Sequence, residues 1–163
     1  MLIPVKVAGI TLDPNTKTPV VILASEDKML PIWIGGLEAH AILIQLQGIE
    51  PARPLTHDLL KRVILSLSAT VESIVITEIK DNTYYAEIML KCQGVNIAID
   101  ARPSDAIALA LRTGADILVE ESVFDGLDTH FSAEEASTPE EQKERIRRYI
   151  ENLRPEDFGN IEP

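Results

Sequence analysis

Alternating apolar and polar residues predict strands in the first part of the chain. Residues 3–10 alternate, and two apolar runs at 19–24 and 29–34 flank a polar turn, which is typical of a hairpin. A glycine pair ends the second run, and residues 37–47 then form an expected helix that is apolar on most of its faces. We expect that helix to be buried, together with its single histidine, His40.

The middle of the chain predicts two further helices and four further strands. The helix expected at 56–68 carries apolar residues at helical spacing, and the helix expected at 104–112 is apolar and ends at Gly114. Asp81 and Asn82 favour a tight turn between the strands on either side of them. The four strands are expected at 71–80, 83–92, 95–99 and 115–119.

Two units of hairpin, strand and helix align faintly with each other. When Glu38 is placed on Asp105, Ile32 falls on Ile99, and each helix begins with an acidic residue followed by alanine. An internal duplication explains the alignment, and so do two similar apolar helices that happen to follow strands. Under a duplication, Glu38 and Asp105 occupy matching places and are expected to face one cleft.

These elements predict an α+β fold for residues 1–120, a compact single domain with mixed β-sheets and mostly buried helices. Residues 121–163 are expected to form an acidic linker and an amphipathic helix, whose apolar stripe within 139–158 suits docking on a partner protein. The helices of the domain are too apolar to be covered by so small a sheet, so we expect a homo-oligomer.

The distribution of charged residues limits the kinds of partner that the protein is expected to bind. Residues 1–119 carry 13 acidic and 10 basic residues, whereas residues 120–163 carry 13 acidic and 5 basic residues, within a net charge of −11. No basic stripe of the kind that grips a nucleic-acid backbone is present. If the protein handles nucleic acid, we expect it to do so at a local site where metal ions offset the carboxylates.

The chain also indicates where the protein works. Its apolar stretches are far shorter than a membrane span, and its first residues do not resemble a signal peptide. The single cysteine, Cys92, lies in an alternating run and is expected to be a half-buried strand thiol rather than a nucleophile. These features favour a reduced, cytoplasmic setting.

The most informative motif is a helix start that occurs twice. Residues 53–58 read Arg-Pro-Leu-Thr-His-Asp, and residues 102–105 read Arg-Pro-Ser-Asp. Proline suits the first helical turn, Thr56 or Ser104 is expected to cap the free amides, and an aspartate lies where the helix dipole favours negative charge. Each start therefore gathers a cation, a carboxylate and unpaired amides, which suit a phosphate or a metal ion.

Five motifs in order resemble the bifunctional nuclease domain family, over roughly residues 3–120. They are Leu-Pro-Ile-Trp-Ile-Gly at 30–35, Glu-Ala-His at 38–40, Arg-Pro-Leu-Thr-His-Asp at 53–58, Asp-Asn-Thr-Tyr-Tyr-Ala at 81–86 and Asp-Ala-Arg-Pro-Ser-Asp-Ala at 100–106. The resemblance implies a compact α+β domain that tends to form oligomers. It also implies hydrolysis of RNA and DNA, an activity attached mainly to plant members.

On this interpretation the chain is a metal-assisted nuclease. His57 with Asp58 is expected to activate water or protonate the leaving oxygen, and Arg53 and Arg102 to bind phosphate. The expected ligands of a Mg²⁺ or Mn²⁺ ion are Asp100, Asp105 and Glu38, because these metals prefer oxygen.

A second hypothesis explains the same residues without catalysis. The aspartates then satisfy amides in the first helical turn, Arg102 pairs with a nearby aspartate, and the protein is an oligomeric binding or regulatory module. Its helix starts bind a small anion, and its C-terminal helix recruits a partner. The arrangement in space distinguishes the two hypotheses. Convergence of Glu38, His57, Asp100 and Asp105 in one open cleft would favour the nuclease, whereas carboxylates that point back into the amides of their own helices would favour the module.

Overall fold

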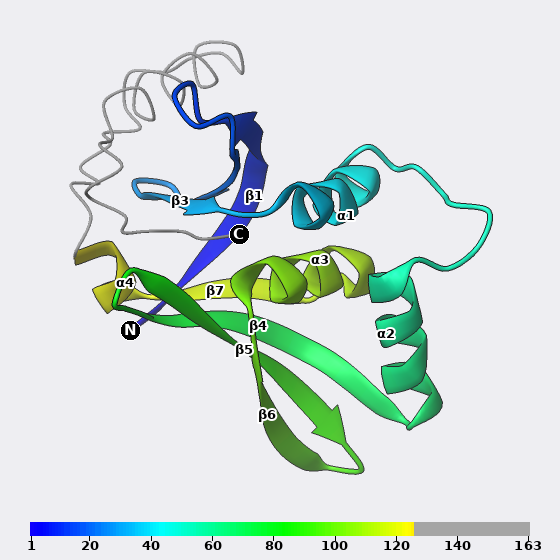
Figure 1. Ribbon diagram of the computed structural model, residues 1–163. Helices are drawn as coiled ribbons and strands as arrows, with labels where there is room; N and C mark the ends of the chain where they lie inside the picture. The colour runs from blue at the N-terminus through cyan, green and yellow to red at the C-terminus, as the bar shows by residue number, and fades with distance from the viewer. Residues whose placement is uncertain (126–163) are drawn as a thin grey trace.

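The protein folds as a single α+β domain in a computed structural model that describes residues 1–125 (Figure 1). Seven strands in this part of the chain form one mixed sheet, in the order β3-β2-β1-β7-β4-β5-β6. The strands are β1 (Leu2–Leu12), β2 (Pro19–Ala24), β3 (Met29–Trp33), β4 (Ala69–Lys80), β5 (Thr83–Cys92), β6 (Val95–Ala101) and β7 (Asp116–Glu120). The helices are α1 (Gly36–Leu46), α2 (Thr56–Ser66), α3 (Pro103–Thr113) and α4 (Glu121–Asp125).

The sheet consists of two antiparallel meanders joined by one central strand. β1, β2 and β3 pair in sequence on one side, and β4, β5 and β6 pair in sequence on the other. β7 lies between them, antiparallel to β1 and parallel to β4. Ile117 of β7 is opposite both Val5 and Ile74, so one short strand holds the two meanders in register.

Each meander is followed by a helix, so the two halves repeat the same order of elements. α1 follows β3, α3 follows β6, and the two helices pack against each other. Glu38 is the third residue of α1, and Asp105 is the third residue of α3. The architecture thus agrees with the faint alignment seen in the sequence and places these two carboxylates at equivalent positions.

The predicted tight turn between β4 and β5 is confirmed. Asp81 and Asn82 both have positive φ angles, 48° and 58°, which the turns that best match the twist of a hairpin require. Gln93 and Gly94, between β5 and β6, also have positive φ angles, 51° and 83°, and form the same kind of two-residue turn. Cys92, at the end of β5, is half-buried as expected.

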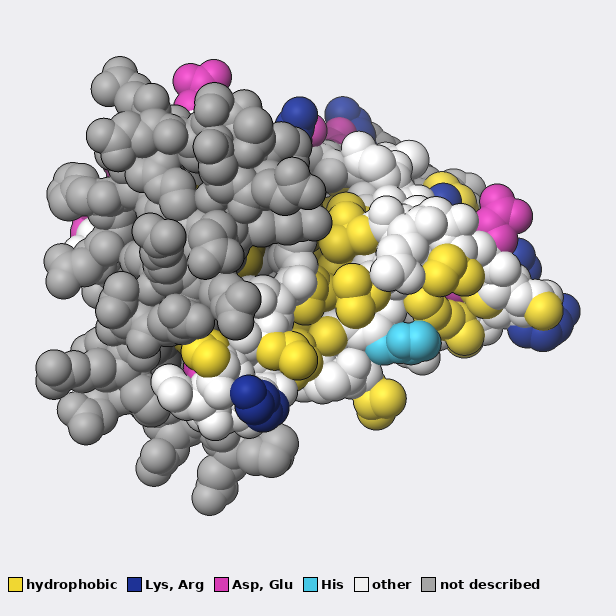
Figure 2. Space-filling model, turned by 90° about the horizontal axis from the view of Figure 1, so that it is seen from above, with side chains coloured by type: hydrophobic (Ala, Val, Ile, Leu, Met, Phe, Trp, Pro, Cys, Tyr) yellow, Lys and Arg dark blue, Asp and Glu magenta, His cyan; other side chains and the backbone are white. Residues whose placement is uncertain are grey.

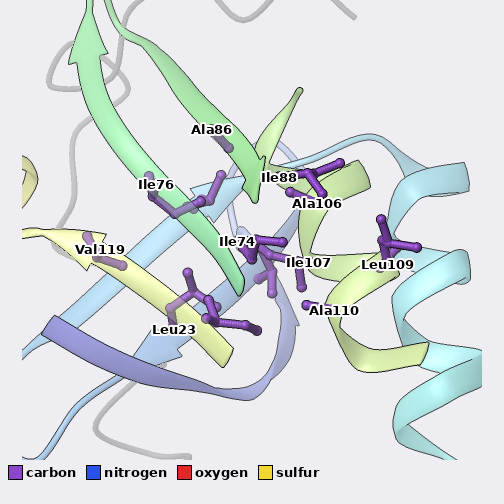
Figure 3. Packing of buried hydrophobic residues seen from close by; sticks show 14 of the residues in the cluster. Leu23, Ile74, Ile76, Ala86, Ile88, Ala106, Ile107, Leu109, Ala110 and Val119 are labelled. Carbon is purple, nitrogen blue, oxygen red and sulfur yellow. The ribbon is translucent and has the colours of Figure 1, made fainter. Parts of the chain in front are cut away.

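Helix α3 lies at the centre of the core. One side of it packs on β4, β5 and β7, and it also contacts α1 and α2, so it has almost no free surface. Ala106, Ile107 and Leu109 are fully buried in the same hydrophobic cluster as Ile74 and Ile76 of β4, and Ile107 lies beside Ile74 (Figure 3). Gly114 ends the helix in the left-handed conformation, as its sequence predicts.

Helices α1 and α2 are much less buried than the sequence indicated. Leu37 of α1 is 84% exposed and His40 is exposed, so the expectation that His40 is buried is wrong. In α2 only Ile64 is buried, although the helix is rich in leucine. Hydrophobic side chains group on the face that lies uppermost in Figure 1, as Figure 2 shows. The predicted apolar stripes therefore exist, but the described domain covers only part of them.

The described domain extends slightly beyond the expected boundary at residue 120. In α4, which follows β7 directly, Val123 and Phe124 are buried in the core. The expected linker and the helix expected within 139–158 lie outside the described residues. Within residues 1–125, no helix has both the length and the apolar character needed to cross a membrane.

Candidate active site

Both repeated helices begin too early for their hydroxyl residues to be caps, by one residue at Thr56 and by two residues at Ser104. Thr56 is the first residue of α2 and Pro103 is the first residue of α3, so the cap positions fall on Leu55 and Arg102. Neither Thr56 nor Ser104 caps its helix, and that prediction is wrong. In α2 the third residue takes over part of this role, because the Asp58 carboxylate accepts a hydrogen bond of 2.9 Å from the Leu55 amide.

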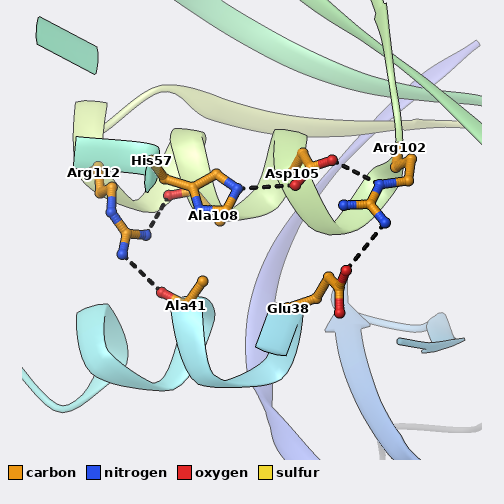
Figure 4. Close-up of polar contacts among 7 residues, drawn as sticks. All are labelled: Glu38, Ala41, His57, Arg102, Asp105, Ala108 and Arg112. Carbon is orange, nitrogen blue, oxygen red and sulfur yellow. Dashed lines mark hydrogen bonds and ion pairs between the residues drawn. The ribbon is translucent and has the colours of Figure 1, made fainter. Parts of the chain in front are cut away.

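Asp105 is the centre of a charged cluster at the start of α3 (Figure 4). Its Oδ1 lies 2.9 Å from Nε2 of His57, and its Oδ2 accepts a hydrogen bond of 2.8 Å from Nε of Arg102. Arg102 in turn donates from Nη1 to Oε1 of Glu38, over 3.1 Å. Residues from α1, α2 and the start of α3 therefore converge, and we call Glu38, His57, Arg102 and Asp105 the Asp105 cluster.

Electrostatics keep Asp105 ionised. Burial by itself would raise the pKa of Asp105, but hydrogen bonds from Arg102 and His57 outweigh it, so the pKa is lowered. The hydrogen bond to Asp105 is also the main cause that raises the pKa of Arg102. The cluster thus holds a permanent cation beside a permanent anion, with the Arg102 side chain 65% exposed.

The ionised Asp105 carboxylate decides which nitrogen of His57 carries the proton. A carboxylate can only accept a hydrogen bond, so Nε2 of His57 must be the donor. In neutral His57 the other ring nitrogen, Nδ1, is then a free base, and it makes no hydrogen bond within residues 1–125. The side chain is only 12% exposed, so the pair is held within the packed region between α2 and α3.

The structure separates His57 from Asp58, the residues that were expected to act together. Asp58 Oδ1 accepts a hydrogen bond of 2.7 Å from Nε of Arg112, near the other end of α3. Burial would raise the pKa of Asp58, but hydrogen bonds from the Leu55 amide and Arg112 lower it. Asp58 thus fastens α2 to α3, and the carboxylate that contacts His57 is Asp105.

Arg112 is the residue that sequence reasoning missed. Its side chain is only 2% exposed, and besides Asp58 it donates to the carbonyl oxygens of Ala108 and Ala41, at 2.8 and 2.9 Å. Ala41 and Ala108 are equivalent in the two halves, so Arg112 bridges matching points of α1 and α3. The available signal was an arginine in a helix that is otherwise almost wholly apolar, since a buried arginine needs several acceptors.

Two of the predicted site residues are not part of the cluster. Asp100 lies on β6 opposite Glu87 of β5. Its neighbour Ile99 lies opposite the buried Ile88, and adjacent residues of a strand point to opposite faces, so the Asp100 side chain points to the other face of the sheet. Arg53 is exposed in the connection before α2. Within residues 1–125, no hydrogen bond or ion pair joins either residue to the Asp105 cluster.

The geometry does not fit the predicted metal site. The carboxylates of Glu38 and Asp105 meet at the guanidinium of Arg102, which lies where a cation shared between them would bind. Asp100 is on another face, as described above. Among residues 1–125, no three His, Cys, Asp or Glu side chains are arranged to hold a metal ion.

The fold and the cluster define an α+β domain in which a histidine–aspartate pair lies beside an exposed arginine. Comparison with known families identifies it further, because residues 20–132 match the bifunctional nuclease domain. The chain belongs to this family.

Relatives of two kinds support the assignment. An uncharacterised protein of Mycobacterium tuberculosis strain H37Rv is 40% identical over 94% of this chain and 96% of its own length. Bifunctional nuclease 2 of rice, Oryza sativa subsp. japonica, is 27% identical over 71% of this chain but only 37% of its own length. Bifunctional nuclease 1 of Arabidopsis thaliana is 26% identical over 62% of this chain and 33% of its own length.

Proposed function

We propose that this protein hydrolyses phosphodiester bonds of RNA, and of DNA as a second substrate. The observation that carries the proposal is the His57–Asp105 pair beside the exposed guanidinium of Arg102. Proton transfer and phosphate binding are the two tasks of such a hydrolysis, and these side chains suit them. Membership of a family whose plant relatives are named bifunctional nucleases supports the same reaction.

In this proposal His57 is the catalytic base and Asp105 positions it. Nδ1 of His57 takes a proton from water while the water oxygen attacks phosphorus, and the bond from phosphorus to the leaving oxygen breaks. The proton then passes from His57 to that oxygen, so no charge is left on the protein. Asp105 stabilises the protonated ring through the hydrogen bond to Nε2 and keeps the ring oriented.

Arg102 is the proposed phosphate ligand. Its Nε and Nη1 each donate to a carboxylate, which leaves N–H groups of the same guanidinium for a phosphate. The two ion pairs hold the guanidinium in place before a substrate arrives. Arg53 is a second proposed contact, further along the nucleic acid, because it is exposed near the start of α2.

A divalent ion, Mg²⁺ or Mn²⁺, remains a prediction for this reaction. Oxygen ligands are available on Glu38, Asp105 and Asp100, but Arg102 lies between the first two and Asp100 faces elsewhere. For that reason the proposed steps use only His57, Asp105 and Arg102. Chelation separates the possibilities, because cleavage that survives EDTA needs no such ion and cleavage that EDTA abolishes requires one.

The test is cleavage of labelled single-stranded RNA and DNA by the full chain, with Mg²⁺, with Mn²⁺ and with EDTA. We expect His57→Ala to lower the rate by roughly 10²–10⁴-fold, the usual contribution of a general base. Asp105→Asn is expected to lower it strongly as well. Asp116→Asn, an exposed aspartate at the start of β7, is the matched control and is expected to cut like the parent. Equal cleavage by all four proteins, purified identically, would contradict the proposal.

A second candidate is a non-catalytic binding or regulatory module, and one observation favours it. Asp58 accepts a hydrogen bond from an amide at the start of its own helix, which is the structural role that this hypothesis gives to the aspartates. This hypothesis adds a protein partner bound through 139–158, whereas a homo-oligomer and a cytoplasmic location are predicted with either function. Binding of inorganic phosphate to Arg102 with no cleavage under any condition would support it.

A further inference from the structure

Strand β6 is an open edge of the sheet. In the described part of the chain it pairs only with β5, so one side of its backbone has no strand partner. Val95, Ile97 and Ile99 point to the same face and are 60%, 41% and 44% exposed. On β5 the residues opposite Ile97 and Ile99 are Leu90 and Ile88, which are buried, so the apolar face of the sheet continues onto an uncovered strand.

β6 lacks the usual protection of an edge strand. Edges are commonly blocked by proline, by lysine or arginine, or by a bulge that twists the strand away. β6 has none of these: its only charged residue is Asp100, and its register with β5 runs without a shift from Cys92–Val95 to Ala86–Ala101. Seven residues of regular strand are therefore free to pair with another strand.

The apolar surface does not end at β6. Sγ of Cys92 lies 3.7 Å from the carbonyl oxygen of Leu67, just after α2, and Cys92 is opposite Val95. Leu67 is 67% exposed, so it extends the row formed by Val95, Ile97 and Ile99. We call these four residues the β6 surface.

We propose that the β6 surface binds a second copy of this chain, with the two β6 strands pairing antiparallel about a two-fold axis at Ile97. Ile97 then lies opposite the partner's Ile97, and Val95 lies opposite the partner's Ile99. An apolar residue faces an apolar residue at each of these positions, and the two seven-stranded sheets become continuous. An isologous contact of this kind is the usual way in which identical chains form a dimer.

Charges on the other face of the strands favour this direction of pairing. Glu87 and Asp100 lie opposite each other at one end of the β5–β6 ladder, where two like charges are unfavourable. Lys91 lies at the other end, opposite Asn96, and pairs there with Glu72 of β4 at 3.4 Å. Antiparallel pairing brings the acidic end of each copy beside the partner's Lys91–Glu72 pair, where the charges balance. Parallel pairing would place the two acidic ends together.

The register is tested by cysteine cross-linking of the full chain in a Cys92→Ser background. Opposed residues of an antiparallel pair have Cα atoms about 4.5–5.5 Å apart, within the roughly 4.4–6.8 Å that a disulfide spans. Ile97→Cys is therefore expected to form a covalent dimer under mild oxidation. Ile99→Cys alone is not, because its two copies would be about 13 Å apart along the strand, but it is expected to cross-link to Val95→Cys when the two proteins are mixed.

Sedimentation velocity tests the surface without cysteines. We expect the parent to be a dimer and Ile97→Glu to be a monomer with an unchanged circular dichroism spectrum, because two like charges would meet at the axis. Mixing Ile97→Glu with Ile97→Lys is expected to restore the dimer. Leu37→Glu, the same kind of change on exposed α1, is the control and is expected to remain dimeric.

The proposal would be overturned by a parent that is monomeric at every concentration, by a trimer, or by an Ile97→Glu variant that is still dimeric. Cross-linking of Ile99→Cys to itself would contradict the register. These measurements follow the mass of the protein, so their outcome is independent of whether the protein cuts nucleic acid.

Discussion

The two halves of the molecule share a frame but differ at their outer edges. The first half, β1-β2-β3-α1, ends its sheet at β3. Pro31 of β3 has no backbone N–H to donate to another strand, and four of the five residues of β3 are buried. The second half, β4-β5-β6-α3, ends its sheet at β6, which has no proline and is exposed along almost its whole length. One edge of the sheet therefore carries a proline and buried side chains, and the other edge carries neither.

The helices of the two halves differ in a complementary way. α3 is almost entirely buried and has Arg102 at its start and Arg112 near its end, whereas α1 starts at glycine and has only three buried residues. Both helices have an acidic third residue, yet the cation that joins Glu38 and Asp105 comes from the second half alone. A repeated frame thus becomes a candidate site because its two copies are unequal.

The largest expected effect comes from removing the carboxylate of Asp58, which pairs with the buried Arg112. Asp58→Ala leaves a buried arginine without its carboxylate, and we expect the free energy of unfolding to fall by about 3–5 kcal/mol. Urea unfolding followed by circular dichroism measures the change.

Two variants serve as controls for this loss. Adding Arg112→Met to Asp58→Ala removes the unpaired charge, so the double variant is expected to recover part of the stability. Asp116→Asn is expected to stay within about 0.5 kcal/mol of the parent. If Asp58→Ala were as stable as Asp116→Asn, Arg112 would not be a significant link between the helices.

A smaller effect is expected where the start of α1 meets the start of α3. The Cβ of Gly35→Ala would collide with the Glu38 carboxylate, which would have to shift and would disturb its ion pair with Arg102, although neither charged residue is changed. Because Arg102 is exposed, we expect less than about 1 kcal/mol of lost stability. We also expect weaker binding of inorganic phosphate, because the guanidinium is less well held.

Isothermal titration calorimetry with phosphate measures this second effect, and Gly36→Ala is the control. A Cβ at Gly36 meets no atom within 4 Å. If Gly35→Ala and Gly36→Ala bound phosphate equally well, the Glu38–Arg102 pair would play no part in positioning the guanidinium.

The smallest effect is the pH dependence that the carboxylates of Asp58 and Asp105 contribute to stability. The pKa values of Asp58 and Asp105 are lowered in the folded protein. Their contribution to stability is therefore complete above the unfolded value of about 3.9, and it is lost as the pH falls through the lower folded values. Urea unfolding from pH 7 to pH 3 is expected to show a shallower loss in Asp105→Asn than in the parent. An equal loss in both would mean that Asp105 gains nothing from His57 and Arg102.

The elements of the fold could be predicted because local signals mark them. The turn at Asp81 and Asn82, the left-handed Gly114 and the alternating strands all depend on a few adjacent residues. The order of the strands could not be predicted, because the central place of β7 depends on pairing with β1 and β4, which are distant in sequence. Burial of α1 was overestimated, since an apolar helix face does not reveal whether the same chain covers it.

The candidate site was predicted in its members more than in its contacts. Glu38, His57, Arg102 and Asp105 lie together in the structure, whereas Asp100, which was expected beside Glu38 and Asp105, does not join them. His57 was expected to act with Asp58, whereas in the structure His57 contacts Asp105 and Asp58 contacts Arg112, because adjacent residues of a helix point about 100° apart. Arg112 was missed because its acceptors are backbone carbonyls, which any sequence provides.

The central place of β7 has a consequence for synthesis of the protein. β7 is the last strand of the described sheet to leave the ribosome, yet Leu2 pairs with Glu120 and Ile74 with Ile117. Until β7 is made, β1 and β4 each have an unpaired edge, and unpaired edges of nascent chains invite aggregation. Closure of the sheet is a late contact between distant parts of the chain, which slows folding. The edges of β1 and β4 therefore stay open to aggregation from the time each strand is made until β7 has left the ribosome.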